Sequence, residues 1–235
     1  MSSQLDKPAR VQAMFARIVR RYDLMNRVMT LGRDQAWRQL TARELRLDGP
    51  APRVLDLATG TGDIALAIAR QYPAATIVAA DFVRPMLQAA QLKSRERGSP
   101  VRDFAQGDAL SLPFADATFD ALTNGFLLRN VADLGRALRE MRRVVKPGGR
   151  VACLEITRPG APVFRQLFHL YFYRAVPVIG RLVGGDAQAY TYLPNSLTDF
   201  PRAAQLRDMM IEAGFREAHY RLLGLGAMAL HIAVV

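Results

Sequence analysis

Residues 54–69, VLDLATGTGDIALAIA, constrain the fold more than any other stretch of the chain. A short apolar run begins at Val54, Gly60 and Gly62 follow it, and apolar residues resume at helical spacing from Ile64. This order predicts a buried strand, a tight turn and a helix. Ligands of open parallel sheets bind beyond the carboxyl ends of the strands. We therefore expect the binding site at this turn.

The same turn indicates a cofactor that carries an adenosyl group. Glycines at 60 and 62 let the backbone approach a ligand closely, and the following helix presents free N–H groups. Together with Ala65, the stretch also fits the glycine fingerprint of dinucleotide folds. Asp81 lies where an acid that binds both ribose hydroxyls is expected. The spacing alone does not separate NAD from other adenosyl cofactors.

Two acids favour a sulfonium cofactor over a dinucleotide. A pyrophosphate favours the positive end of a helix, whereas Asp63 places a carboxylate there. A sulfonium cofactor has no phosphate and is positively charged, so Asp56 and Asp63 suit it. The alternative is that Asp63 only caps the helix. Farther along, Asp108 is placed to accept the adenine amino group, and Ala109 to offer a backbone N–H to the ring.

The composition predicts a globular cytoplasmic protein. The 235 residues are 50% hydrophobic and 23% charged, and no apolar run approaches the roughly 18 residues of a membrane span. The first residues lack the apolar centre of a signal peptide. Cys153 is the only cysteine, and the three histidines have no ligand spacing. We therefore expect neither a disulfide framework nor a metal site.

The net charge of +11 invites a polyanion or an anionic membrane surface as a partner. However, 29 of the 32 basic residues are arginine, which indicates a compositional bias as well as binding. The sequence shows neither an appended RNA-binding module nor a base-reading motif. We therefore expect no nucleic acid partner.

Strand and helix patterns alternate along the chain and end in a hairpin. Strands are expected at 54–57, 76–80, before Gly107, at 119–124, 151–156, 216–223 and 227–235, and helices at 7–22, after Gly62, at 84–97, 133–145 and 203–213. This pattern predicts an α/β fold, a Rossmann-like doubly wound sheet of seven strands with a reversed last strand. We expect a single domain over 1–235, divided into an N-terminal helical extension or lid (1–50), a cofactor-binding core (51–157), a helical cover (158–202) and a C-terminal helix and hairpin (203–235).

The extension and the cover are the segments outside this alternation. Residues 7–22 carry an apolar stripe at helical spacing, which predicts an amphipathic helix packed on the main domain. Residues 22–40 mix polar and large apolar groups, which suits a lid over a partly apolar site or a plain packing helix. Residues 164–183 are rich in aromatics and are interrupted by Pro177. They are expected to form an inserted helical cover, with a core helix as the alternative.

Several stretches resemble the quinone C-methyltransferases that make menaquinone and ubiquinone. They are YDLMNRVMTLGRDQAW at 22–37, FLLRNV at 126–131, RVVKPGGRVACLEIT at 143–157, YTYLPNSLTDFP at 190–201 and ALH at 229–231. The resemblance implies a class I methyltransferase that moves a methyl group from S-adenosylmethionine to a ring carbon of a prenylated quinol. Residues 153–201 look more like the members that act on demethylmenaquinol. A methoxy-benzoquinol precursor of ubiquinone, or both substrates, is the alternative.

The resemblance also implies roles for single residues. Cofactor contacts fall on Thr61, Asp81, Asp108 and Ala109, and a fifth family position, usually serine, is Gly125 here. Arg129 is expected to stabilise the developing phenolate and Asn130 to orient the ring. Tyr22, Asp34 and His231 are the candidates for accepting the proton. Asp34 stands where histidine is usual in the family, which puts the role of that position in question.

Three other functions, a membrane contact and a homodimer are also compatible with the sequence. An RNA methyltransferase would use the same turn, an NAD(P)-dependent oxidoreductase would bind a dinucleotide there, and a binding protein would hold the cofactor without chemistry. An isoprenoid tail would explain the aromatic cover and a peripheral contact with the inner face of the membrane. The sequence is also compatible with a homodimer.

Overall fold

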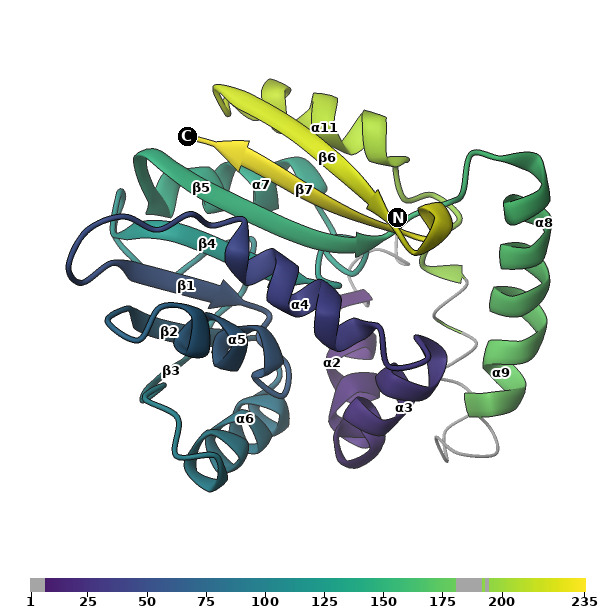
Figure 1. The fold of residues 1–235 in the computed structure, drawn as a ribbon, viewed down its shortest axis with the longest axis horizontal. Coiled ribbons are helices and arrows are strands. Elements are labelled where there is room, and N and C mark those ends of the chain that lie inside the picture. Colours follow the sequence, from purple (N-terminus) through teal and green to yellow (C-terminus); the bar gives the residue numbers. More distant parts are fainter. Residues whose placement is uncertain (1–6, 181–191, 193–194) are drawn as a thin grey trace.

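The computed structural model describes residues 7–180, 192 and 195–235, and within them it contains a seven-stranded sheet of order β3-β2-β1-β4-β5-β7-β6 (Figure 1). The strands are β1 (Arg53–Leu57), β2 (Thr76–Asp81), β3 (Asp103–Gln106), β4 (Phe119–Gly125), β5 (Val145–Ile156), β6 (Glu217–Leu223) and β7 (Met228–Val234). Strands β1 to β5 pair in parallel, whereas β7 runs antiparallel to both β5 and β6. The predicted doubly wound sheet with a reversed last strand is confirmed.

Helices cover both faces of this sheet. The helices in the described part of the chain are α2 (Lys7–Ile18), α3 (Tyr22–Met29), α4 (Asp34–Arg43), α5 (Asp63–Gln71), α6 (Arg84–Glu96), α7 (Leu134–Val144), α8 (Pro162–Leu170), α9 (Val176–Ile179) and α11 (Ala203–Glu212). Figure 1 shows α4 and α5 in front of the sheet and α7 and α11 behind it. Most side chains of the central strands β1, β2, β4 and β7 are buried between these layers, as expected of a covered sheet.

The glycine turn has the predicted form. Strand β1 is buried from Val54 onward, and Gly60 and Gly62 adopt φ values of +57° and +87°, which favour glycine. A Cβ on Gly62 would lie 3.2 Å from the Cβ of Ala90 on α6. The close approach of α6 therefore adds a packing reason for glycine at the start of α5.

Strand β5 begins six residues earlier than expected. Val145 already pairs with Phe119, and the register shifts before Arg150 pairs with Ala121. The KPGG stretch, read as a stop signal, ends α7 but lies within the strand as an irregularity. A Cβ on Gly149 would lie 2.6 Å from the backbone oxygen of Asp120, so only glycine fits this bend without displacing β4.

The helical cover continues through Pro177 rather than breaking there. Between α8 and α9 lies one wider π-helical turn, Tyr171–Ala175. Pro177 is the second residue of α9, after this turn, and has no N–H to donate into it, so the interruption of the hydrogen-bond ladder is local. Residues 181–183 of the expected cover, and 190, 191, 193 and 194 of the motif at 190–201, lie outside the described residues. No helix among the described residues is long and apolar enough to cross a membrane.

Candidate active site

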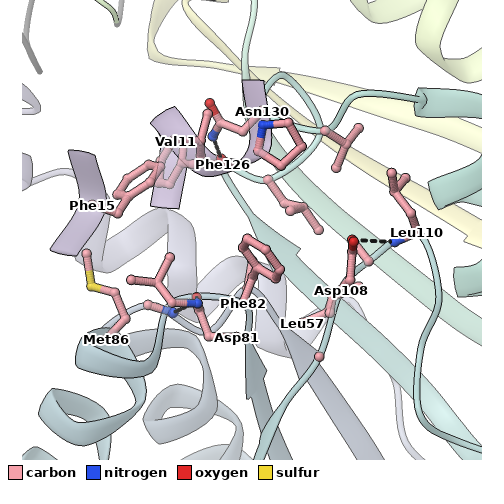
Figure 2. Close-up of a pocket in the computed structure, with 18 of the residues that line it drawn as sticks. Val11, Phe15, Leu57, Asp81, Phe82, Met86, Asp108, Leu110, Phe126 and Asn130 are labelled. Carbon is pink, nitrogen blue, oxygen red and sulfur yellow. Dashed lines mark hydrogen bonds between the residues drawn. The ribbon is translucent and has the colours of Figure 1, made fainter. Parts of the chain in front are cut away.

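A cavity opens beyond the carboxyl ends of β1, β2 and β4, beside the glycine turn. Its volume is about 840 Å³ with its open mouth included. Six of the predicted site residues line it, namely Tyr22, Gly60, Asp81, Asp108, Ala109 and Asn130. Figure 2 shows Val11 and Phe15 of α2 on one side and Asp81, Phe82 and Met86 on the opposite side. Helix α2 therefore closes the cavity with its apolar stripe.

Asp81 joins the end of β2 to the glycine turn. One carboxylate oxygen accepts the N–H of Gly60 and the other the N–H of Val83, both at 2.8 Å. Burial raises the pKa of Asp81, against the opposing effect of these N–H donors. Each carboxylate oxygen keeps a second lone pair, so the fixed side chain can still accept hydrogen bonds from a ligand.

Asp108 lies at the opposite end of the same cavity, after β3. Its Oδ1 accepts the N–H of Leu110 at 2.9 Å, as Figure 2 shows, and Ala109 between them is buried. The described residues that line the cavity include these two carboxylates and neither lysine nor arginine. Such a wall suits hydroxyl, amino and cationic groups.

The electrostatic argument from Asp63 is corrected by the structure. Asp63 does not line the cavity, and its carboxylate lies 2.7 Å from Arg38 Nη1 and 2.9 Å from Lys93 Nζ. Burial acts to raise the pKa of Asp63, but these two cations hold it below its usual value. The carboxylate is therefore neutralised inside the protein, and it no longer provides an argument against a dinucleotide.

Three more predicted cofactor residues also lie behind the cavity wall rather than in it. Asp56 accepts hydrogen bonds from Thr59 Oγ1, Thr123 Oγ1 and the N–H of Ala65, and burial raises its pKa to about 6. Thr61 Oγ1 donates to Asp23 of α3 at 2.5 Å. Gly62, Thr61 and Asp56 are absent from the described lining, so they shape the turn from behind.

A second, apolar cavity of about 970 Å³ shares walls with the first. Phe15, Tyr22 and Phe126 line both. Phe126 holds a φ of +63°, a conformation that side chains larger than glycine rarely adopt, and its N–H donates to the oxygen of Leu154 at 2.8 Å. The cover contributes Phe168, Tyr171, Phe172 and Val176 to this cavity. The stripe of α2 and the aromatics of the cover thus meet around one space.

Arg129 lines the second cavity and is held by a partner that sequence reasoning missed. Its guanidinium forms a buried ion pair with Glu155 at the end of β5, and it lies 5.5 Å from the ring centroid of Phe126. Glu155 is 1% exposed. The sequence did contain a signal for this pair, since Glu155 is the one acid in the apolar strand expected at 151–156. A buried carboxylate requires a cation or several hydrogen-bond donors nearby.

Tyr22 lines both cavities, whereas Asn130 lines the first and is hydrogen-bonded to Phe126 and Tyr192, which line the second. The Asn130 amide donates to the Phe126 oxygen at 2.8 Å, and its Oδ1 accepts the Tyr192 hydroxyl at 3.0 Å. Burial raises the pKa of Tyr22, against the effects of nearby Arg38, Asn26 and Arg129. Tyr22 is therefore a neutral phenol at pH 7.

The other two candidates for accepting a proton are not among the described residues that line either cavity. Asp34 is buried beside Arg38, 3.6 Å from its Nε, and its N–H donates to the Thr30 hydroxyl oxygen at 3.2 Å. His231 lies on β7 with Nε2 2.9 Å from the Ala203 oxygen, and burial lowers its pKa to about 4. Neither side chain lines the described cavities. This corrects the expectation that either could face a substrate there.

His231 instead predicts a pH dependence of stability. Its pKa falls from 6.5 in the unfolded chain to about 4 in the fold, so the fold favours the neutral ring. This stability is present above pH 6.5 and is lost as the pH falls toward 4, by about 3 kcal/mol. His231→Gln keeps a donor for Ala203 and does not titrate. Urea unfolding at pH 7 and pH 4.5 should show a smaller loss for this variant, and equal losses would contradict the assignment.

Comparisons with known proteins agree with this geometry. The model of the ubiE/COQ5 methyltransferase family matches residues 3–235. The demethylmenaquinone methyltransferase of Roseiflexus castenholzii is 46% identical over 95% of this chain and 92% of its own length, and that of Deinococcus radiodurans is 47% identical over 97% and 93%. The ubiquinone/menaquinone biosynthesis C-methyltransferase UbiE of Desulfotalea psychrophila is 45% identical over 98% and 92%.

Solved structures support the fold. A SAM-dependent methyltransferase from Thermotoga maritima superposes with a TM-score of 0.66 at 19% identity, covering 94% of this chain and 98% of its own. One from Aquifex aeolicus superposes with a TM-score of 0.59 at 17% identity, covering 83% and 89%. The predicted fold class and family are confirmed: the chain belongs to the ubiE/COQ5 methyltransferase family.

Proposed function

We propose that this chain, as one domain, transfers a methyl group from S-adenosylmethionine to a ring carbon of demethylmenaquinol. One observation carries the proposal. A cavity with two carboxylates and no basic residue among its described lining shares Phe15, Tyr22 and Phe126 with an apolar cavity that contains a buried arginine. The names of the relatives, demethylmenaquinone methyltransferase and UbiE, support the same class of substrate.

The first cavity fits the adenosyl donor. Asp81 would accept the two ribose hydroxyls, and Asp108 with the Ala109 N–H would hold the adenine. When bound, S-adenosylmethionine supplies an electrophilic methyl group on a positively charged sulfur. Gly60 lines this cavity and lets the backbone approach the donor closely. We keep Asp56, Thr61, Gly62 and Asp63 as residues that support the turn from behind.

The second cavity fits the quinol ring and its tail. The ring carbon would take the methyl group that the donor supplies, the electron pair of the carbon–sulfur bond would stay on sulfur, and the ring carbon would then lose its own proton. Loss of the hydroxyl proton raises electron density on the ring, and Arg129 would stabilise the phenolate. Asn130, which is held by Phe126 and Tyr192, would orient the ring. Of the three candidates for accepting the hydroxyl proton, Tyr22 is the one that lines both cavities, so we assign the proton relay to it.

A labelled-methyl assay tests the proposed function. The acceptors are chemically reduced demethylmenaquinone, the methoxy-benzoquinol precursor of ubiquinone, and bulk RNA. Label in demethylmenaquinol alone is the expected result. Label in both quinols would mean a dual enzyme, as the UbiE name of one relative allows. Label only in RNA, or in none of the three, would overturn the proposal.

Asp81→Asn is expected to weaken S-adenosylmethionine binding by roughly 10- to 100-fold, because hydrogen bonds to a charged acceptor contribute about 1.5–3 kcal/mol. For the same reason affinity should fall as the pH is lowered through the raised pKa of Asp81. Isothermal titration calorimetry measures both effects. Asp103→Asn, an exposed acid on neighbouring β3, is the control. Equal affinities for Asp81→Asn and the parent would remove Asp81 from the cofactor site.

The outer side of α8 supports contact with the inner face of the membrane. Val163, Leu167 and Leu170 share one side of the helix and are 57–66% exposed. The opposite side carries Phe168, which stacks on Phe172 with ring centroids 4.9 Å apart and lines the second cavity. One helix would thus contact lipid outward and the substrate cavity inward. The net charge of +11 adds attraction to anionic lipid.

Replacing Val163, Leu167 and Leu170 together by serine should lower binding to phosphatidylglycerol vesicles by roughly tenfold or more, because three apolar side chains no longer enter the lipid. Vesicle sedimentation measures this. The matched control replaces Leu92, Ile211 and Leu222, which are also exposed but lie on α6, α11 and β6. Similar losses in both triple variants would argue against a contact specific to α8.

A further inference from the structure

Two buried N–H groups beside the second cavity have no hydrogen-bond partner. They are Nδ2 of Asn26 on α3 and Nε of Arg129 after β4. Both residues line this cavity. An unsatisfied buried donor costs about 1–3 kcal/mol, so such groups are rare unless they serve a ligand. Two of them on one apolar cavity indicate a place for an oxygen acceptor.

The two donors come from separate elements and line the same cavity. Asn26 lies one helical turn after Tyr22 on α3, so the two side chains are neighbours on one side of that helix. Tyr22 itself borders both cavities. The donors are therefore close to the wall across which the methyl group would pass.

The surrounding contacts leave these donors available. Glu155 engages Nη1 of Arg129, so the fork is anchored from behind while Nε stays unpaired. The same pair cancels the arginine charge, so a bound anion would rely on directed N–H groups. The end of α3 is fixed by the Thr30 hydroxyl, which donates to the backbone oxygen of Asn26 at 2.7 Å. The amide of Asn26 is thus carried on an ordered turn.

We propose that Asn26 Nδ2 and Arg129 Nε form a two-donor subsite for one ionised ring oxygen of the substrate, which makes Asn26 a catalytic residue. The inference rests on the proposed function and narrows its substrate class to rings with a free hydroxyl at this position. A methyl ether there would present no anion and would be rejected. The subsite acts on charge that develops when the hydroxyl proton leaves, so its contribution falls mainly on kcat.

The test uses a nitronaphthol whose naphtholate form absorbs visible light, added to the full chain saturated with S-adenosylhomocysteine. The parent should lower the apparent pKa of the bound probe by about one unit, and Asn26→Leu, which has no donor, should remove about half of this shift. Asn26→Gln, which keeps the amide, should restore part of it. Gln88→Leu removes an exposed amide from α6 and should leave the shift intact.

Methyl transfer to demethylmenaquinol gives the second readout. Asn26→Leu should lower kcat by roughly 10- to 100-fold with little change in S-adenosylmethionine affinity or thermal stability. Equal probe pKa values in Asn26→Leu and the parent, or failure of the parent to shift or bind the probe, would overturn the subsite. A parent that shifts the probe but methylates no quinol would support the subsite and refute the proposed function.

Discussion

Replacing Arg129 with lysine is expected to lower kcat for methyl transfer by about 10²- to 10³-fold, the range measured for loss of one donor to a developing oxyanion. Lysine keeps the positive charge and can still pair with Glu155 behind the cavity. It has neither the planar fork nor a second N–H that points away from that pair. The loss should therefore fall on catalysis while the fold and the cofactor site stay intact.

Steady-state kinetics with demethylmenaquinol and calorimetry with S-adenosylmethionine separate these effects. We expect a lower kcat with unchanged cofactor affinity, because Arg129 lines the second cavity and not the first. Arg139→Lys, at an exposed position on α7, is the matched control. A kcat for Arg129→Lys equal to that of the parent would show that charge alone suffices and would remove the directed N–H from the mechanism.

Local patterns predicted the elements because each element depends on neighbours in sequence. The strand, turn and helix around Gly60 follow from apolar spacing and glycine conformation within 16 residues. The reversed β7 follows from the hairpin pattern at the end of the chain. The start of β5 was predicted too late because Gly149 packs closely against the backbone of β4. Such a contact between distant residues is not contained in any local sequence pattern.

Charge partners were predicted poorly because they are distant in sequence. Asp63 meets Arg38 and Lys93, which lie 25 and 30 residues away, and Arg129 meets Glu155 at a distance of 26. The sequence does not show which basic residue pairs with each acid. The argument from Asp63 therefore assumed that its charge faces a cofactor, whereas Arg38 and Lys93 neutralise it. Only the sheet order brings α4, α5 and α6 together at the turn.

The lining of the second cavity was only partly predictable from the sequence. Residues 22–40 were expected to form a lid over a partly apolar site or a plain packing helix, and Met25, Met29 and Trp37 of this segment line the cavity. The apolar stripe of α2 was expected to pack on the main domain, and a stripe that packs has the same spacing as one that lines a cavity. Phe15 in fact borders both cavities, and the aromatics of the cover close the second one. Whether the stripe packs on the domain or lines a cavity depends on the distance between the cover and the sheet. That distance is a property of the assembled fold.

Glu155→Gln is expected to lower the free energy of unfolding by about 3–5 kcal/mol, because it leaves the buried charge of Arg129 without a counterion. Both side chains of this pair are at most 5% exposed, so water cannot replace the lost carboxylate. Glu155 also accepts the N–H of Ile156 at 3.0 Å. Urea unfolding at pH 7 measures the change, and kcat should fall with it because Arg129 loses its anchor.

Two comparisons decide whether the ion pair itself carries this effect. Asp208→Asn breaks an exposed pair with Arg207 and should cost at most about 1 kcal/mol. The double variant Arg129→Met with Glu155→Leu removes both buried charges and should cost much less than the two single changes together. If Glu155→Gln lowered the free energy of unfolding no more than Asp208→Asn does, the buried ion pair would not stabilise the fold. The orientation of Arg129 would then have to come from its contact with Phe126. A large single cost with a small double cost would show that each buried charge is tolerated mainly because the other neutralises it.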